Sequence, residues 1–188
     1  MKSLWSLVLT VSRALQWKLL AFVPMDKRIA QLRKRGIRIG KNCFIARTAW
    51  PTEPYLIEIG DHVAISAGCQ FVTHDAAIWL FRHENPDMDV FGSIKVGNNT
   101  YFGTNCTILP NCQIGSDCVI GSGSVVRGNI PDGSVVFGNP AKVVMKTSLL
   151  KYLLLHNKHR LETHNMSPAD KEKAIRAHFG ISETGGGR

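Results

Sequence analysis

The sequence has no apolar run that approaches eighteen residues, no CxxC pair and no Cys/His cluster with the spacing of zinc ligands. The first absence excludes a clear transmembrane span. The other two exclude the common zinc sites, so no metal is expected. An odd number of cysteines, five, does not suit a closed disulfide framework and favours a reducing, cytoplasmic compartment. Arg13 and Lys18 interrupt the apolar N-terminus, which argues against a secretion signal.

Acidic residues are almost missing from the first 41 positions, where Asp26 stands against ten bases. The whole net charge of +9 lies in this segment, because the rest of the chain balances 13 bases against 13 acids. No nucleic-acid partner is expected, since such an enzyme more often carries its bases near its site. Residues 1–35 combine the bases with apolar residues and are expected to form one or two helices, which predicts a helical cap on the fold. The alternative is weak, salt-sensitive peripheral binding to the inner face of the membrane. The two can coexist.

A six-residue repeat begins at residue 39. The apolar positions are Ile39, Ile45, Ile59, Ile65, Phe71, Val96, Phe102, Ile108, Ile114, Ile120 and Val126. Glycine often follows them, and a small residue usually stands four positions later. All five cysteines occupy that small-residue slot, which explains them as semi-buried packing residues. A period of six fits neither an α-helix nor an alternating strand. It fits short strands joined by tight turns, with three hexapeptides per triangular coil and residues 18 apart stacked at the sheet spacing.

The repeat divides the chain into three parts. Residues 1–36 form an N-terminal basic helical segment, residues 37–146 the repeat domain, and residues 147–188 a C-terminal helical segment. Residues 147–165 are expected to be one helix, and a capping box at Ser167 opens another that runs to about His178. The repeat breaks at 51–58 and again at 76–95, where a longer excursion forms an extruded loop and a candidate functional element.

His74 stands where the chain leaves the repeat for that loop, at the edge of the expected cleft. Imidazole suits general-base work near neutral pH, but an exposed histidine in a turn is the competing interpretation. Asp75 could orient the imidazole, although adjacent side chains do not always meet and a backbone carbonyl could serve instead. His83 lies in the loop and could contact substrate. His62 lies in a coil turn and is expected at the surface.

Four segments carry a resemblance to a known family: THD at 73–75, ILPNCQIGSDCVIGSGSVV at 108–126, GNPAKVV at 138–144 and EPYLIEIG at 53–60. Together with the repeat, they resemble the hexapeptide-repeat acyltransferases, in the maltose, galactoside and surface-polysaccharide O-acetyltransferase branch. The resemblance implies an all-β solenoid, a left-handed parallel β-helix with flanking N- and C-terminal α-helices. It also implies acetyl-CoA as donor, and a homotrimer whose sites lie between neighbouring subunits. By the same resemblance, His74 matches the catalytic base.

The resemblance also implies residues for both substrates. It places backbone and pantetheine contacts at Thr104 and Ser122, where small side chains let a ligand approach. Arg127 and Lys142 match positions near the phosphates of the donor, while Gly128 stands where the family often has lysine. Glu53 could bind hydroxyls of the acceptor, or could be an ordinary charged turn residue.

The expected function is acetyl-CoA-dependent O-acetylation of a sugar, in the synthesis of capsule, O-antigen or exopolysaccharide. N-acetylation of an amino sugar is the near alternative, because it needs the same base and donor groove. A non-catalytic assembly module is the alternative from another class, and would differ by failing to bind CoA. A carbonic-anhydrase-type enzyme needs three histidine ligands for zinc, whereas the coils offer only His62 and His74.

Overall fold

A computed structural model describes residues 24–182. The chain divides into two compact units, residues 1–147 and residues 148–188, which we describe separately. Of the N-terminal segment discussed above, residues 1–23 lie outside the described residues, and with them most of the segment invoked for membrane contact. No helix in residues 24–182 is long and apolar enough to cross a membrane.

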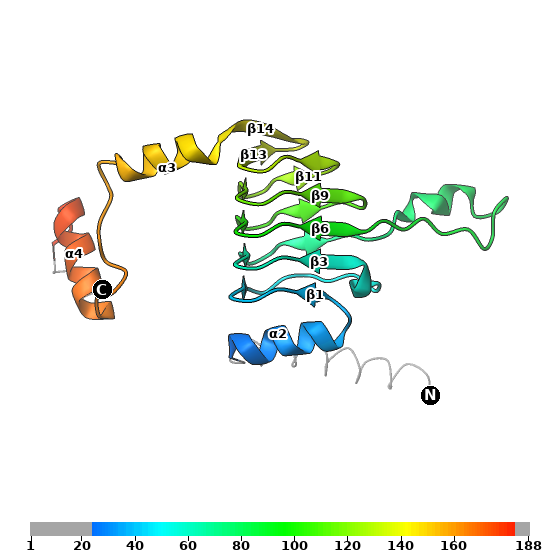
Figure 1. Ribbon diagram of the computed structural model, residues 1–188, viewed down its shortest axis with the longest axis horizontal. Helices are drawn as coiled ribbons and strands as arrows, with labels where there is room; N and C mark the ends of the chain where they lie inside the picture. The colour runs from blue at the N-terminus through cyan, green and yellow to red at the C-terminus, as the bar shows by residue number, and fades with distance from the viewer. Residues whose placement is uncertain (1–23, 183–188) are drawn as a thin grey trace, which may run out of the picture. The chain divides into compact units, whose positions relative to one another are not determined.

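Short strands of the first unit form three sheets (Figure 1). The first sheet is parallel and holds β1 (Arg38–Ile39), β3 (Ile57–Ile59), β6 (Ile94–Val96), β9 (Cys112–Ile114) and β12 (Asn129–Ile130). The second holds β2 (Phe44–Ile45), β4 (Ala64–Ile65), β7 (Tyr101–Phe102), β10 (Val119–Ile120) and β13 (Ser134–Gly138), with β14 (Ala141–Lys146) added antiparallel. The third holds the parallel strands β5 (Gln70–Phe71), β8 (Thr107–Ile108) and β11 (Val125–Val126).

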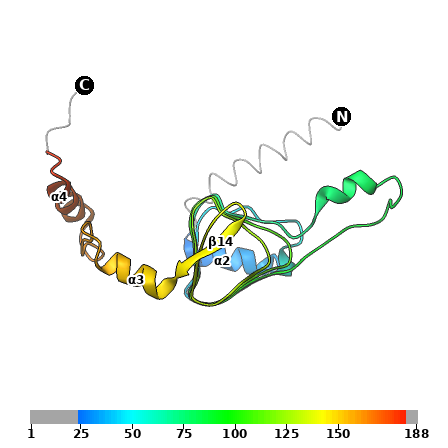
Figure 2. The ribbon, with the colours of Figure 1, turned by 90° about the horizontal axis from the view of Figure 1, so that it is seen from above.

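The chain visits the three sheets in turn, so each circuit is one coil and Figure 2 shows the coils superposed in a three-sided outline. Tyr101 pairs with Val119 and Thr107 with Val125, which confirms the expected stacking of residues 18 apart. We name the corners by the sheets they join. Corner I joins the first sheet to the second, corner II the second to the third, and corner III the third to the first.

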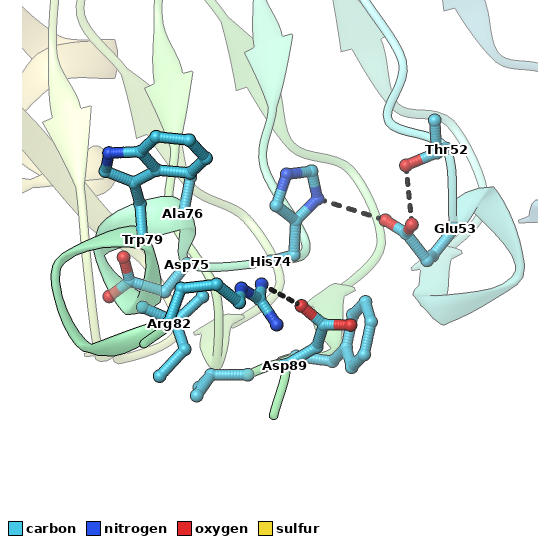
Figure 3. A pocket seen from close by; sticks show the side chains of 11 residues that line it. Thr52, Glu53, His74, Asp75, Ala76, Trp79, Arg82 and Asp89 are labelled. Carbon is cyan, nitrogen blue, oxygen red and sulfur yellow. Dashed lines mark hydrogen bonds and ion pairs between the residues drawn. The ribbon is translucent and has the colours of Figure 1, made fainter. Parts of the chain in front are cut away.

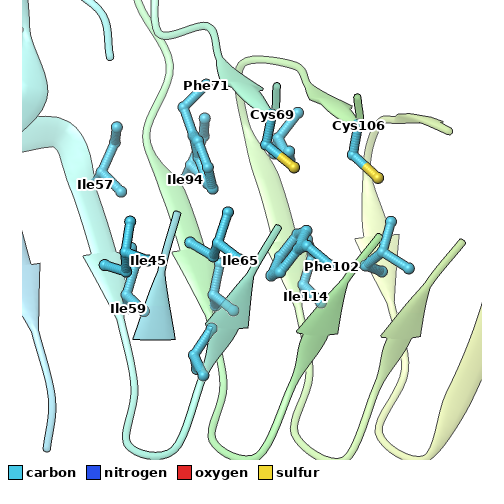
Figure 4. Packing of buried hydrophobic residues seen from close by; sticks show 14 of the residues in the cluster. Ile45, Ile57, Ile59, Ile65, Cys69, Phe71, Ile94, Phe102, Cys106 and Ile114 are labelled. Carbon is cyan, nitrogen blue, oxygen red and sulfur yellow. The ribbon is translucent and has the colours of Figure 1, made fainter. Parts of the chain in front are cut away.

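The apolar residues of the repeat fill the inside of the stack (Figure 4). Ile45, Ile65, Phe102, Ile108 and Ile120 are fully buried. Each coil covers the inner face of its neighbours, so the burial of any one coil depends on the next. This shared core makes the stack a rigid support for residues at its corners.

Helix α2 (Met25–Lys34) covers the first coil. Ile29 and Leu32 are buried in the common core. Arg28 donates to the Ile45 carbonyl at 3.0 Å, and Arg33 donates to the Ile39 and Gly40 carbonyls. The interpretation as a cap therefore fits residues 25–34, since two of the bases bind backbone carbonyls of the stack.

The second unit contains most of α3 (Thr147–Leu155) and all of α4 (Pro168–Phe179). The Ser167 hydroxyl accepts the Asp170 N–H and Gly180 ends α4 at a φ of 64°, close to the expected bounds. The helix expected over 147–165 is shorter than predicted and ends at Leu155. Asn157 explains the difference, because its side chain accepts the His159 N–H and offers the backbone a turn instead of a helix.

Candidate active site

A cavity of about 620 Å³ lies at corner III, between the stack and the extruded loop (Figure 3). Its volume is within the range of small-molecule sites. Its lining comes from the two breaks in the repeat and from the two residues before the second break: Thr52, Glu53, His74, Asp75, Ala76, Ile78, Trp79, Arg82, Asp89, Val90 and Phe91. The two segments that interrupt the six-residue period therefore meet at one place.

His74 is held by a short antiparallel ribbon at the base of the loop. Asp75 N–H donates to the Val90 carbonyl at 2.9 Å, and Gly92 N–H donates to the Thr73 carbonyl at 2.7 Å. Between these bonds, His74 forms a β-bridge with Phe91. Thr73 is fully buried beneath it. These contacts fix the backbone of His74 while its side chain stays 45% exposed at the cavity.

Glu53 lies beside His74 at the cavity, with Oε2 at 3.2 Å from Nδ1 (Figure 3). Pro54 is buried and begins the 3-10 turn η2 (Pro54–Leu56), which sets Glu53 at the cavity edge. The Thr52 hydroxyl donates to Oε1, and the Thr73 hydroxyl donates to Oε2 at 3.0 Å. The hydrogen bond from the Thr52 hydroxyl is the largest effect that lowers the pKa of Glu53 from its ordinary value of 4.5, and burial opposes it. The Thr73 hydroxyl and the His74 imidazole lower the pKa further.

The ionised Glu53 decides which nitrogen of His74 carries the proton. A carboxylate only accepts hydrogen bonds, so Nδ1 is the donor in this pair. Nε2 is then the acceptor, and no described residue hydrogen-bonds to it. The side chain of His74 is thus oriented with a lone pair available to a ligand in the cavity.

The structure corrects the expectation that Asp75 orients His74. The Asp75 carboxylate accepts the Ala77 N–H at 2.9 Å and caps the 3-10 helix η3 (Ala76–Phe81). An Asp side chain is short and bonds readily to the backbone two residues on, which makes it a local capping group here. Glu53, expected to contact the acceptor, is the carboxylate that meets His74.

His83 does not line the cavity, contrary to the expectation for a substrate contact. Its side chain is 75% exposed and its Nε2 lies 3.2 Å from Glu84. His62 lies in a corner I turn, where its Nδ1 is 2.8 Å from the Asn99 side chain. Neither histidine therefore joins His74.

Sequence reasoning missed Trp79, Arg82 and Asp89, which all line the cavity. Arg82 and Asp89 form an ion pair at 2.8 Å inside the loop. The opposite charges of Arg82 and Asp89 within residues 76–95 could have indicated this ion pair from the sequence. No feature of the repeat indicated Trp79.

The residues expected to bind the donor lie at other corners or on other coils. Thr104 and Ser122 are exposed in successive corner II turns, where Thr104 N–H donates to Ser122 Oγ at 3.2 Å. Arg127 follows β11 at corner III, two coils beyond His74, and Lys142 lies in β14. None of the four lines the cavity around His74. A single chain therefore does not bring Thr104 and Ser122 to the general-base candidate.

The five cysteines lie in the packed interior of the stack. All five are free and buried. Burial raises the pKa of Cys112 to about 11, which keeps that thiol protonated. Within residues 24–182 there is no group of three or more His, Cys, Asp or Glu side chains that could hold a metal ion.

Comparison with known sequences supports the repeat. Residues 93–128 match the family model described as bacterial transferase hexapeptide (six repeats). Protein CapG of Staphylococcus aureus is 42% identical over 130 residues, which cover 68% of this chain and 76% of CapG.

Solved structures that resemble this chain are also acetyltransferases. A maltose O-acetyltransferase from Clostridium difficile 630 has 33% identity and a TM-score of 0.52, and the match covers 59% of each chain. A hexapeptide-repeat-containing acetyltransferase from Vibrio cholerae has 25% identity and a TM-score of 0.58, covering 72% of this chain and 89% of that one. Its crystal structure in complex with acetyl coenzyme A has 30% identity and a TM-score of 0.51, covering 59% and 60%.

Proposed function

Because this chain belongs to the bacterial hexapeptide-repeat transferase family, we propose that it is an O-acetyltransferase that moves the acetyl group of acetyl-CoA to a sugar hydroxyl. The relatives named as a maltose O-acetyltransferase and as an acetyltransferase in complex with acetyl coenzyme A support both halves of this reaction. The segment from Glu53 to Gly60, which resembles the version in polysaccharide gene clusters, favours synthesis of a surface polysaccharide. That the β-helix winds in the left-handed sense is part of this proposal and rests on membership of the family.

One observation carries the proposal: His74 and Glu53 form a hydrogen-bonded pair at the wall of a cavity. In this pair Glu53 acts as a positioning residue, and His74 as the general base. The ionised carboxylate holds the tautomer that accepts at Nε2, and it stabilises the imidazolium that forms when His74 takes a proton.

Acetyl-CoA supplies an acetyl group activated as a thioester. His74 Nε2 accepts the proton of the acceptor hydroxyl as the new C–O bond forms, and returns that proton to the sulfur as the C–S bond breaks. The products are the acetylated sugar and free CoA thiol, so atoms and charge balance. A backbone N–H near Thr104 or Ser122 stabilises the charge on the carbonyl oxygen.

We propose a homotrimer because the site is otherwise incomplete. His74 lies at corner III and the donor residues Thr104 and Ser122 lie at corner II. In a closed ring of three subunits, corner III of one subunit can face corner II of the next. Arg127 and Lys142 then provide charge for the CoA phosphates.

The proposed location is the cytoplasm, at most peripheral at the inner face of the membrane. The support is the +9 charge of the first 41 residues. Co-sedimentation with anionic vesicles at low salt measures the membrane part. Binding no stronger than that of a chain lacking residues 1–23 would refute it.

The test is release of CoA thiol from acetyl-CoA in the presence of maltose, galactose, N-acetylglucosamine or glucosamine. We expect His74→Ala to lower turnover by about two to four orders of magnitude while CoA binding survives. His83→Ala is the matched control, since His83 lies outside the cavity. An unchanged rate in folded His74→Ala protein would overturn the assignment. Activity on glucosamine alone would favour N-acetylation, and no CoA binding would favour an assembly module.

A further inference from the structure

The extruded loop exposes an unusual number of large apolar side chains. They are Trp79 at 81%, Leu80 at 71%, Phe81 at 49%, Met88 at 42%, Val90 at 47% and Phe91 at 50% exposure. Single exposed apolar residues are ordinary, but a cluster on one segment indicates a binding surface. Among them, only Trp79, Val90 and Phe91 line the cavity that contains His74. The cavity therefore has an apolar, partly aromatic wall.

The loop holds this wall in place. Arg82 donates to the Pro86 carbonyl at 3.0 Å and the Met88 carbonyl at 2.7 Å, and it pairs with Asp89. Trp79 stands on η3, which is capped by Asp75 at its start and anchored by the buried Ile78. Arg82 N–H also donates to the Trp79 carbonyl at 3.3 Å. The indole is thus presented from an ordered backbone, so little ordering is required when a ligand binds.

The facing wall is polar. Thr52, Glu53 and His74 contribute a hydroxyl, a carboxylate and an imidazole, and Figure 3 shows His74 between Glu53 and Trp79. A pyranose ring has the same division, because its C–H groups form an apolar face and its hydroxyls point outward from the rim. A ring that places its C–H face on the indole directs rim hydroxyls toward the polar wall.

We propose that Trp79 is the stacking platform for the acceptor, a pyranose whose apolar face rests on the indole while one rim hydroxyl reaches His74 Nε2. This inference rests on the proposed function and names the substrate subsite. Phe91 closes the same wall, with its ring centroid 6.4 Å from that of His74. Trp79 contributes to acceptor binding and not to proton transfer, so its loss affects the KM for sugar more than kcat.

The experiment compares Trp79→Ala, Trp79→Phe and Leu80→Ala by the thiol-release assay with the same four sugars. Trp79→Ala should raise the KM of the acceptor roughly five- to tenfold, the scale of a specific aromatic contact. Its kcat should change less than about threefold, and its KM for acetyl-CoA should not change. Trp79→Phe should retain most of the affinity. Leu80→Ala should match the wild type, because Leu80 is exposed on the same loop but lies outside the cavity.

Sugar titrations of wild type and Trp79→Phe, followed by tryptophan fluorescence, separate this proposal from the proposed function. Wild-type fluorescence that responds to a sugar, with a smaller response in Trp79→Phe, supports the platform even without turnover. Turnover with an unchanged acceptor KM in Trp79→Ala overturns the platform and leaves the enzyme assignment standing. Loss of the trimer in Trp79→Ala would assign Trp79 to a subunit contact and overturn it too. Neither binding nor turnover with any sugar would overturn both.

Discussion

At the scale of single residues, several small side chains of the repeat lie within hydrogen-bond distance of backbone carbonyls in the turns. Cys69 Sγ lies 3.1 Å from the Gly103 carbonyl, and Cys106 Sγ lies 3.2 Å from that of Gly121. Ser124, in an equivalent position, donates to the Gly121 carbonyl at 2.6 Å. These carbonyls are buried, and an unpaired buried acceptor is costly. Cys69 and Cys106 therefore fill space and also pair with backbone carbonyls of the turns.

Glu53→Gln should lower kcat by about 10- to 100-fold with little change in the KM for acetyl-CoA. The amide keeps the size of the side chain but cannot stabilise an imidazolium or fix the tautomer of His74. Steady-state kinetics measure the effect. Glu84→Gln, on the loop but outside the cavity, is the control. Equal kcat values for wild type and Glu53→Gln would show that Glu53 does not position the base.

The dependence of Tm on pH is a second test of the contacts of Glu53. Its pKa is lowered in the folded protein, so its contacts contribute stability that is fully present above 4.5 and is lost as pH falls through the lowered folded value. The difference in Tm between wild type and Glu53→Gln should therefore be largest near neutral pH and shrink in acid. A difference that stays constant across this range would contradict the lowered pKa.

At the scale of the hexapeptide, the turn requires one residue in the left-handed region. Within residues 24–182, six residues other than glycine have positive φ: Asn42, His62, Asn99, Asn105, Asn111 and Asp117. Each stands three positions before an apolar residue of the core. Asn and Asp tolerate this conformation better than most residues. This positive-φ position explains His62 as a turn residue without a catalytic role.

Substitutions at Asn105, which has a φ of 58°, test whether the turn needs a residue that tolerates the left-handed region. Asn105→Val should destabilise the protein by about 1–2 kcal/mol or more, because a β-branched residue is strained in the left-handed region. Asn105→Gly should stay within about 1 kcal/mol of the wild type. Thermal melting of the two variants measures the difference. Equal Tm values for the two substitutions would contradict the conformational explanation.

At the scale of the whole molecule, the proposed site is divided between corners. His74 and Glu53 lie at corner III, and Thr104 and Ser122 lie at corner II of the same chain. Corners of one rigid stack cannot approach each other, because the packed core separates them. The proposed chemistry therefore needs corner III of one subunit and corner II of another.

Subunit mixing tests this division. His74→Ala and Ser122→Trp should each be inactive, the second because a bulky side chain fills the exposed corner II turn. Co-expression should restore activity, since about a quarter of the clefts pair an intact His74 from one subunit with an intact Ser122 from its neighbour. Light scattering should show a trimer. No recovery in verified mixed trimers would place both residues in one subunit's site and contradict the division.

The sequence by itself determined the parts of the molecule that repeat. The six-residue period predicted the buried residues, the three hexapeptides per coil and the 18-residue stacking, because each strand pairs only with an equivalent strand of the next coil. It also placed His74 beside the extruded loop, since a break in a regular period is visible without coordinates. The shortened α3 was missed because a side-chain turn at Asn157 overrides helix propensity.

Only the tertiary structure decided how the breaks meet. Glu53 and His74 are 21 residues apart and follow no repeat, so their contact depends on how two irregular segments exit the stack. Asp75 is adjacent to His74 in sequence, yet its carboxylate accepts the Ala77 N–H and caps η3. His83 and Trp79 are both exposed in one loop, and only Trp79 lines the cavity. Periodicity fixes neighbours in the stack, whereas the direction of a side chain in a loop is fixed only by the contacts of that loop.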